Sequence, residues 1–386
     1  MRQLYMDNGA TSFPKAPGVA EKVFDYLKNV GTNLNRSSHG SSYEAESVAY
    51  ETRELLCSLF QYDKPENVVF TKNVTESLNV LIKGIFRSGD HILISSMEHN
   101  AVMRPLNGLR SKGIAYDKLA CDREGVLDVN EIGKHILPNT KGIIMTHASN
   151  VCGTILDIES VGKLCRQNGL AFIVDTAQTA GLFDIEFLSM GIDALAFTGH
   201  KSLLGPQGIG GFVISDKLAR EMETLMEGGT GSLSDIEVQP DLMPDKFESG
   251  TLNIPGIFGL NESLKYIIRE TTEAIREKEM ALTGVFIEAL LNMDHIDLIG
   301  RKNIMNRTGI VSIDFRSADN GIMAQSLREA FGITTRSGLH CAPSAHQTLG
   351  TFPRGTLRFG LGHFMSEDDI HYAIDSVYRL RSIMDR

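Results

Sequence analysis

The stretch Leu170-Ala-Phe-Ile-Val-Asp175-Thr-Ala-Gln178 is apolar up to Asp175 and contains β-branched residues. This pattern predicts a buried strand that ends at the acid. A second apolar run, Ala194-Leu-Ala-Phe197, leads into Thr198-Gly-His200-Lys201 and predicts another strand that ends near a lysine. In open α/β sheets, ligands bind outside the carboxyl ends of the strands. We therefore expect Asp175 and Lys201 to meet at one edge of a sheet.

An acid and a lysine at that edge match what pyridoxal phosphate chemistry needs. The lysine forms a Schiff base, and the acid pairs with the protonated ring nitrogen so that the ring can accept electrons. The alternative is an ordinary interior ion pair or two solvated strand ends. The two residues alone leave both interpretations open.

The surrounding sequence alternates strand patterns with helical patterns from about residue 50 to 230. We expect strands over residues 67–71, 91–94, 142–146, 170–174, 194–197 and 210–214, and helices over 75–85 and 158–168. Such alternation predicts an α/β fold with a mostly parallel sheet covered by helices on both faces.

From about residue 255 the alternation of strand and helix patterns stops. A long helical pattern runs to about residue 292, followed by strand patterns over 309–315 and 356–361 and helical patterns over 323–331 and 366–383. These segments indicate a smaller α+β domain. We predict a large domain of residues 13–255 and a small domain of residues 1–12 and 256–386.

Composition narrows the class of protein. The 386 residues carry a formal net charge of -10, which disfavours non-specific binding to nucleic acid or to an anionic membrane. We find no apolar run long enough to span a bilayer and expect no export signal. Five cysteines without paired spacing suit a reducing cytoplasm better than a disulfide framework.

Three polar residues follow other predicted strands. Thr75 opens a helix whose backbone N–H groups could bind phosphate, although it could also be a simple N-cap. His99 could stack on a flat ring or move protons, and a structural role is the alternative. Asn150 could hydrogen-bond a ring substituent or form an Asx turn.

A second notable segment is Arg336-Ser-Gly-Leu-His-Cys341-Ala-Pro343, with Arg358 downstream. Cys341 could be a nucleophile if its thiolate is favoured and exposed, and Arg358 could hold a substrate carboxylate. The alternative is a buried, inert cysteine and a surface arginine. We expect the remaining cysteines, Cys57, Cys121, Cys152 and Cys165, to be small core residues.

Eight motifs in order resemble the cysteine desulfurase and selenocysteine lyase family of pyridoxal-phosphate enzymes, which has the class V aminotransferase fold. The motifs span nearly the whole chain: Tyr5-Met-Asp7-Asn8-Gly9-Ala10-Thr11, Asn73-Val-Thr75-Glu, Met97-Glu-His99-Asn, Ser149-Asn150, Asp175-Thr-Ala-Gln178, Thr198-Gly-His200-Lys201, Phe247-Glu-Ser-Gly250-Thr251 and Arg336-Ser-Gly-Leu-His-Cys341.

The resemblance implies a role for each position. Lys201 would carry the cofactor, Asp175 would hold the ring-nitrogen proton, Gln178 would bind the phenolic oxygen and His99 would stack on the ring. The phosphate would be bound by Val74, Thr75, Thr198 and His200, with Thr251 contributed by the neighbouring subunit of a homodimer. Asn150, Arg336 and Arg358 would hold the substrate carboxylate, and Asn150 would also contact the cofactor. Cys341 would take sulfur from cysteine as a persulfide, leaving alanine, for transfer to an acceptor protein such as one in iron–sulfur cluster assembly.

The chain departs from the family pattern at two places. Ser202-Leu-Leu204 makes the loop after Lys201 one residue longer than in many relatives, and Asn73 stands where glycine is common. The short stretch from Cys341 to Arg358 resembles the subgroup with a compact cysteine loop, so we expect the acceptor to come to the mouth of the site. The alternatives to a cysteine desulfurase are a selenocysteine lyase, an aminotransferase or another β-eliminating lyase, and a non-catalytic scaffold.

Overall fold

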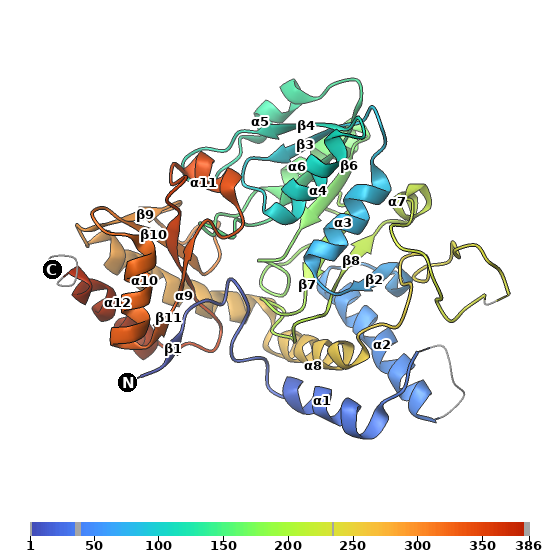
Figure 1. The fold of residues 1–386 in the computed structure, drawn as a ribbon, viewed down its shortest axis with the longest axis horizontal. Coiled ribbons are helices and arrows are strands. Elements are labelled where there is room, and N and C mark those ends of the chain that lie inside the picture. Colours follow the sequence, from blue (N-terminus) through green and yellow to red (C-terminus); the bar gives the residue numbers. More distant parts are fainter. Residues whose placement is uncertain (1, 35–39, 234, 382–386) are drawn as a thin grey trace.

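The computed structural model describes residues 2–34, 40–233 and 235–381, which form a larger and a smaller α/β unit (Figure 1). The larger unit is built on a seven-stranded sheet whose strands lie in the order β2-β8-β7-β6-β5-β3-β4. Their bounds are β2 Val68–Thr71, β3 His91–Ser95, β4 Ala115–Leu119, β5 Thr140–Thr146, β6 Ala171–Asp175, β7 Ala194–Thr198 and β8 Gly210–Ile214. Only β8 runs antiparallel to its neighbours, so the expected mostly parallel sheet is confirmed.

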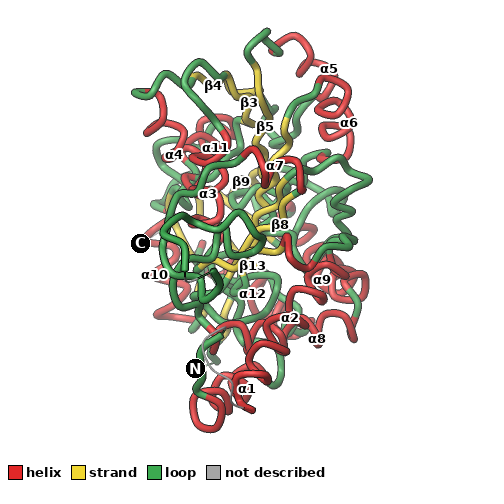
Figure 2. The backbone as a smooth tube through the Cα atoms, turned by 90° about the vertical axis from the view of Figure 1, so that its right-hand side faces the viewer, coloured by secondary structure: helices red, strands yellow, loops and turns green. Residues whose placement is uncertain are grey.

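Helices cover both faces of this sheet because successive side chains of each strand point to opposite faces. Phe172 and Val174 of β6 join one apolar core, whereas Ile173 joins the other. The first core includes side chains from α2 (Gly40–Leu59), α6 (Ile158–Asn168) and α8 (Ile254–Glu270), and the second from α3 (Val74–Ile85), α4 (Asn100–Arg110) and α7 (Asp216–Glu221). Figure 2 shows α3 and α4 on one side of the strands and α6 on the other. The chain also forms α1 (Val19–Asp25), a π-helical turn (Tyr26–Val30) and α5 (Val129–Ile132).

The smaller unit contains an antiparallel sheet in the order β12-β13-β10-β9 and a short parallel pair, β1-β11. Its strands are β1 Leu4–Tyr5, β9 Ile296–Ile299, β10 Ile310–Phe315, β11 Ile333–Thr334, β12 Arg336–Gly338 and β13 Thr356–Gly360. Its helices are α9 Thr272–Leu291, α10 Asn320–Phe331, α11 Pro343–Leu349 and α12 Glu367–Arg379. A separate apolar core, with residues from β1, β10, β13, α9 and α12, holds this unit together.

The predicted long helix over residues 255–292 is wrong as a single element. Thr271 interrupts it with a φ of 69°, and its hydroxyl accepts the Ala274 N–H as the N-cap of α9. Side chains of α8 lie in the core of the larger unit. We therefore propose that the domain boundary lies near Thr271 instead of at residue 255.

Two other differences concern helix ends and membranes. The predicted helix over 366–383 ends at Arg379 in the structure, and residues 382 and 383 lie outside the described residues. In the described part of the chain, none of the helices combines the length and hydrophobicity needed to cross a bilayer.

Candidate active site

Asp175 and Lys201 are delivered to the carboxyl edge of the larger sheet by neighbouring strands. β6 ends at Asp175, which lies opposite Ala196 of the parallel strand β7, and Lys201 follows β7 by three residues. Asp175 is 4% exposed, accepts the Ala177 N–H at 2.9 Å, and has a pKa raised by burial, an effect that the Lys201 charge opposes. Burial lowers the pKa of Lys201 to about 8, although Asp175 favours its charged form. The site therefore holds a lysine that is partly neutral near physiological pH.

The N-terminus of α3 lies beside the end of β7. Gly210 is the register partner of Thr198, and a Cβ at Gly210 would lie 2.9 Å from the Asn73 Cα. The N-cap of α3 is Asn73, whose side chain accepts the Glu76 N–H at 3.0 Å; the alternative reading of Thr75 as N-cap is wrong. Because Asn73 has a φ of -176°, the backbone there does not need glycine. Val74 and Thr75 thus occupy the first helical turn, where N–H groups have no intrahelical acceptor.

Two buried polar atoms near this helix end have no protein partner. Thr198 Oγ1 and His200 Nδ1 are both without a hydrogen bond among the described residues. Burial lowers the pKa of His200 to about 4, so its ring is neutral and can donate one N–H. A hydroxyl, an imidazole and a free helix N-terminus are the donors that a phosphate group needs.

His99 lies at the start of α4 in a fixed orientation. It is the N-cap, and its Nδ1 accepts the Ala101 N–H at 3.0 Å. The neutral ring must therefore carry its proton on Nε2. Burial, followed by the positive charge of Lys201, lowers the pKa of His99 to about 4. The ring can donate through Nε2 without carrying a net charge.

Gln178 lies in the turn after β6, near the N-terminal segment of the chain. Its Nε2 donates to the Gly9 carbonyl at 3.1 Å, so the side chain is held where β6 meets residues 8–12. Gln178 and Lys201 line the same small cavity of about 30 Å³ between the two units. The role of Gln178 at the cofactor, which the resemblance to the family implies, stays a prediction.

The two arginines expected to bind a carboxylate are neighbours on the antiparallel sheet. Arg336 of β12 lies directly opposite Arg358 of β13, which puts both side chains on one face of the sheet. Arg358 is almost fully buried and pairs with Asp7 at 2.8 Å, while its Nη1 donates to the Asn150 carbonyl at 2.9 Å. Arg336 is exposed. Paired like charges favour a bound anion between them.

Cys341 is the exposed cysteine among five free ones. Its carbonyl accepts the Asn100 N–H at 2.8 Å. Asn100 follows His99 and is the first residue of α4. Cys57, Cys152 and Cys165 are buried, as expected, and Cys121 is only partly buried. Burial raises the pKa of Cys57 to about 12 and that of Cys121 to about 11, so these thiols remain protonated.

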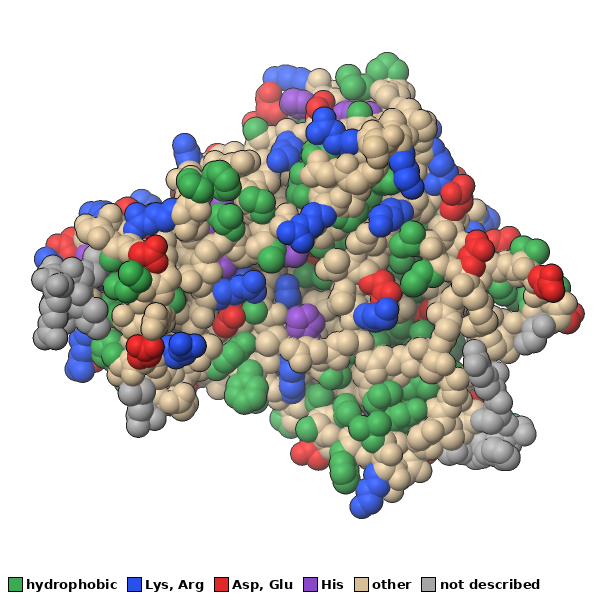
Figure 3. All heavy atoms as spheres, viewed as in Figure 1, with side chains coloured by type: hydrophobic (Ala, Val, Ile, Leu, Met, Phe, Trp, Pro, Cys, Tyr) green, Lys and Arg blue, Asp and Glu red, His purple; other side chains and the backbone are tan. Residues whose placement is uncertain are grey.

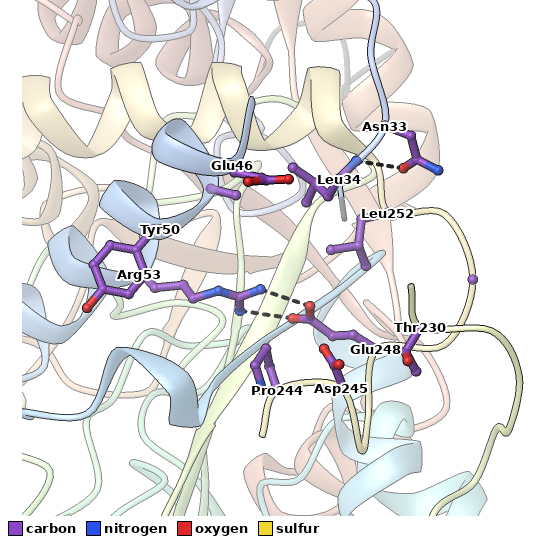
Figure 4. A pocket seen from close by; sticks show the side chains of 12 residues that line it. Asn33, Leu34, Glu46, Tyr50, Arg53, Thr230, Pro244, Asp245, Glu248 and Leu252 are labelled. Carbon is purple, nitrogen blue, oxygen red and sulfur yellow. Dashed lines mark hydrogen bonds and ion pairs between the residues drawn. The ribbon is translucent and has the colours of Figure 1, made fainter. Parts of the chain in front are cut away.

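Thr251 and Lys201 line different pockets within the chain. Thr251 is exposed and lines an open pocket of about 350 Å³ that also contains Lys72 and Glu76 at the start of α3. The preceding segment is fixed by a buried ion pair between Glu248 and Arg53 of α2, at 2.8 Å (Figure 4). Figure 4 shows the cavity of about 290 Å³ beside this pair, whose lining contains neither Lys201 nor Cys341.

Two acids lie inside the motifs that resemble the family but received no role from the sequence, Glu98 and Asp7. Glu98 is fully buried behind Asp175; its Oε1 accepts the Ser95 hydroxyl at 2.5 Å and the Thr146 N–H at 2.9 Å. Burial raises the pKa of Glu98 to about 8. Asp7 pairs with Arg358, which lies 351 residues away in the sequence, so no local pattern could predict the pair. The available signal for Glu98 was an acid three residues after the buried strand β3.

Comparison with known proteins places this site in a family. Residues 4–372 match the family model described as aminotransferase class-V, and the chain belongs to that family. It is 31% identical to a probable cysteine desulfurase of Methanothermobacter thermautotrophicus, over 95% of this chain and 92% of the relative. It is 29% identical to the cysteine desulfurase IscS of Salmonella schwarzengrund, over 98% of this chain and 94% of the relative.

Solved structures agree. The apo structure of cysteine desulfurase from Thermococcus onnurineus superposes with a TM-score of 0.92 at 30% identity, covering 98% of this chain and 94% of that one. The cysteine desulfurase CsdA from Escherichia coli gives a TM-score of 0.88 at 25% identity, with the same coverages. The predicted family resemblance and the pyridoxal-phosphate type of fold are therefore confirmed.

Proposed function

We propose that this chain removes sulfur from L-cysteine, holds it as a persulfide on Cys341 and releases L-alanine. The chain is a pyridoxal-phosphate-dependent cysteine desulfurase, as its family and its relatives indicate. The observation that carries the persulfide step is that the exposed Cys341 accepts the Asn100 N–H through its carbonyl, directly after His99, whose pKa the Lys201 charge helps to lower.

The donors at the sheet edge fit the cofactor. Unpartnered Thr198 Oγ1 and His200 Nδ1, with the free N–H groups of Val74 and Thr75, suit its phosphate, and the buried Asp175 suits its ring nitrogen. Pyridoxal phosphate supplies an electron sink for bonds broken next to the substrate nitrogen.

Lys201 would join the cofactor through its amine and move protons at the substrate carbon. Its pKa of about 8 keeps part of the amine neutral near pH 7 to 8, which is the form that reacts with an aldehyde. His99 would offer its Nε2–H across the ring, and Gln178 would bind the phenolic oxygen.

The substrate carboxylate would lie against Arg336 and Arg358, with Asn150 beside them. Asp7 pairs with one side of the Arg358 guanidinium. The Arg358 Nε has no partner among the described residues, and Arg336 lies opposite on β12, so both arginines have N–H donors available for a carboxylate. Cysteine and selenocysteine carry the same carboxylate, so these residues select an amino acid but do not distinguish sulfur from selenium.

Cys341 would attack the substrate sulfur as a thiolate. The new S–S bond forms as the substrate C–S bond breaks, and the bonding pair stays on carbon, where a proton from the site completes alanine. Cysteine and the Cys341 thiol thus give alanine and a Cys341 persulfide, with no outside oxidant. An aminotransferase has no use for an exposed thiol at this place.

We also propose a homodimer, in which Thr251 reaches the phosphate of the neighbouring subunit. Exposed apolar side chains over α1, the π-helical turn after it and α2 support an interface there, among them Phe24, Leu27, Tyr43 and Tyr50 (Figure 3). We further propose that an acceptor protein takes the sulfur for iron–sulfur cluster assembly. We also propose that the protein works in the cytoplasm, because its five free cysteines suit a reducing compartment.

The test is product analysis with and without the thiol. Purified protein, pyridoxal phosphate, L-cysteine and a reductant should give alanine and sulfide in equal yield. The Cys341→Ala variant should keep the cofactor absorbance but turn over cysteine about 10²-fold more slowly. The Cys121→Ala control should keep both the absorbance and the rate of cysteine turnover. Unchanged turnover in Cys341→Ala would contradict the proposed role of Cys341.

A further inference from the structure

The backbone that carries Cys341 has an unusual conformation. His340 and Cys341 both have positive φ values, 48° and 59°, although neither is glycine. The left-handed region costs an ordinary residue about 1–2 kcal/mol, and consecutive residues seldom adopt it. Contacts from elsewhere must therefore hold this loop.

Those contacts come largely from the larger unit. Asn150 Nδ2 donates to the His340 carbonyl at 2.7 Å, and the Asn100 N–H donates to the Cys341 carbonyl at 2.8 Å. Within the smaller unit, the His340 ring shares a hydrogen bond with Thr356 Oγ1 at 3.0 Å. Two of these three bonds thus fix the thiol-bearing loop against the sheet edge that holds Lys201.

Asn150 is itself fixed from the opposite direction. Its side chain is 9% exposed, and its carbonyl accepts a hydrogen bond from Arg358. Hydrogen bonds therefore link Arg358 to Asn150 and Asn150 to His340, the residue before Cys341. One Asn150 N–H is committed to this loop.

We propose that Asn150 and the Asn100 N–H are positioning groups that hold Cys341 in its left-handed conformation, aimed at the substrate sulfur. This inference rests on the proposed function and adds a task for Asn150 beyond contact with the substrate carboxylate. Without the two donors, the loop relaxes toward ordinary backbone angles and the thiol leaves its position.

Comparison of cysteine with selenocysteine separates the two tasks. Both substrates have the same carboxylate, but the weaker C–Se bond breaks without a thiol: the bonding pair stays on carbon to give alanine, and selenium leaves at the zero oxidation level and is reduced to selenide by the added reductant. In Asn150→Ala, we expect turnover of cysteine to fall by about 10²-fold, as a misplaced reacting group does. Selenocysteine turnover should fall by no more than about 10-fold, the loss of one hydrogen bond to the shared carboxylate. The ratio of the two rates should approach that of Cys341→Ala.

A second variant leaves the carboxylate residues intact. Asn100 is the first residue of α4, a position that favours proline, and the preceding His99 already has the extended angles that proline requires (φ -73°, ψ 158°). Asn100→Pro removes the N–H that binds the Cys341 carbonyl and keeps the helix. It should show the same selective loss of cysteine turnover.

Hydrogen exchange of the cofactor-loaded protein supplies a readout independent of activity. Backbone amides in residues 336–345 should exchange faster in both variants. The control is Asn168→Ala, because Asn168 Nδ2 also donates to a backbone carbonyl, that of Leu164 at 2.8 Å, on an exposed helix end. It should change neither exchange in that segment nor the ratio of rates.

Equal losses for the two substrates with unchanged exchange would overturn the proposal and leave Asn150 as a carboxylate ligand alone. A wild-type protein that turns over neither substrate would instead overturn the proposed function. The exchange result would still decide whether Asn150 and Asn100 hold the loop.

Discussion

The two halves of the site are built in opposite ways. Asp175 and Lys201 follow ordinary strands whose apolar side chains fix them in place on both faces of the sheet. Cys341 lies on a short loop with left-handed backbone, held by donors that lie far away in the sequence; Asn150 is 190 residues from His340. The cofactor half is thus specified locally by strand patterns, whereas the thiol half depends on contact between the two units.

The largest effect should come from the sheet edge. Lys201→Ala removes the amine that we propose joins the cofactor, so turnover of cysteine should fall by more than about 10³-fold. Absorbance of the protein with added pyridoxal phosphate should lose the Schiff-base band. Lys163→Ala, an exposed lysine paired with Glu159, serves as the control. Substantial turnover in Lys201→Ala would mean that another amine does the chemistry.

Asp175→Asn should lower the pKa of the Lys201 amine below about 8, because the carboxylate is the main group that favours its charged form. The pH dependence of Schiff-base formation with pyridoxal phosphate measures this pKa. Asp193→Asn is the matched control: burial also raises the pKa of Asp193, which accepts the Phe172 N–H at the opposite end of β6. An unchanged or raised Lys201 pKa in Asp175→Asn would show that the Asp175 carboxylate does not stabilise the charged form of Lys201.

The loop should respond through stability. Thr356→Val keeps the shape of the side chain but removes the hydroxyl that partners His340 Nε2 and the Ser312 hydroxyl. A buried polar group without a partner costs about 1–3 kcal/mol, so the free energy of unfolding in urea should fall by that amount. Thr224→Val, whose hydroxyl binds Glu227 near the surface, should stay within about 0.5 kcal/mol. Equal effects would show that the His340 contact does not stabilise the loop.

The last effect concerns Glu98 and grows with pH. Its pKa is raised from 4.5 to about 8 in the folded protein, so its contribution to stability is fully present below pH 4.5 and is lost as pH rises toward 8. Glutamine cannot ionise, and Glu98→Gln should therefore gain stability relative to wild type between pH 5 and pH 9, by about a few degrees in Tm. A Tm difference independent of pH would show that Glu98 ionises normally in the folded protein.

The strand ends could be predicted from sequence because continuous apolar runs stop at an acid and before a lysine. The edge strand β4 was not predicted, since its polar and mostly exposed Ala-Tyr-Asp-Lys-Leu lacks that pattern. The break at Thr271 and the conformation of His340 and Cys341 also escaped prediction, because no glycine or asparagine marks these positive φ values. Pairings such as Asp7 with Arg358 join residues 351 apart and have no local signal.

The most direct test of the central claim is to reduce the cofactor-loaded protein with borohydride and map the labelled lysine by mass spectrometry. We predict a pyridoxyl phosphate group on Lys201. Lys15 is the competing amine, because burial also lowers its pKa to about 8 and its Nζ donates to the His200 carbonyl at 3.0 Å. Label on Lys15, or on neither lysine, would contradict the account.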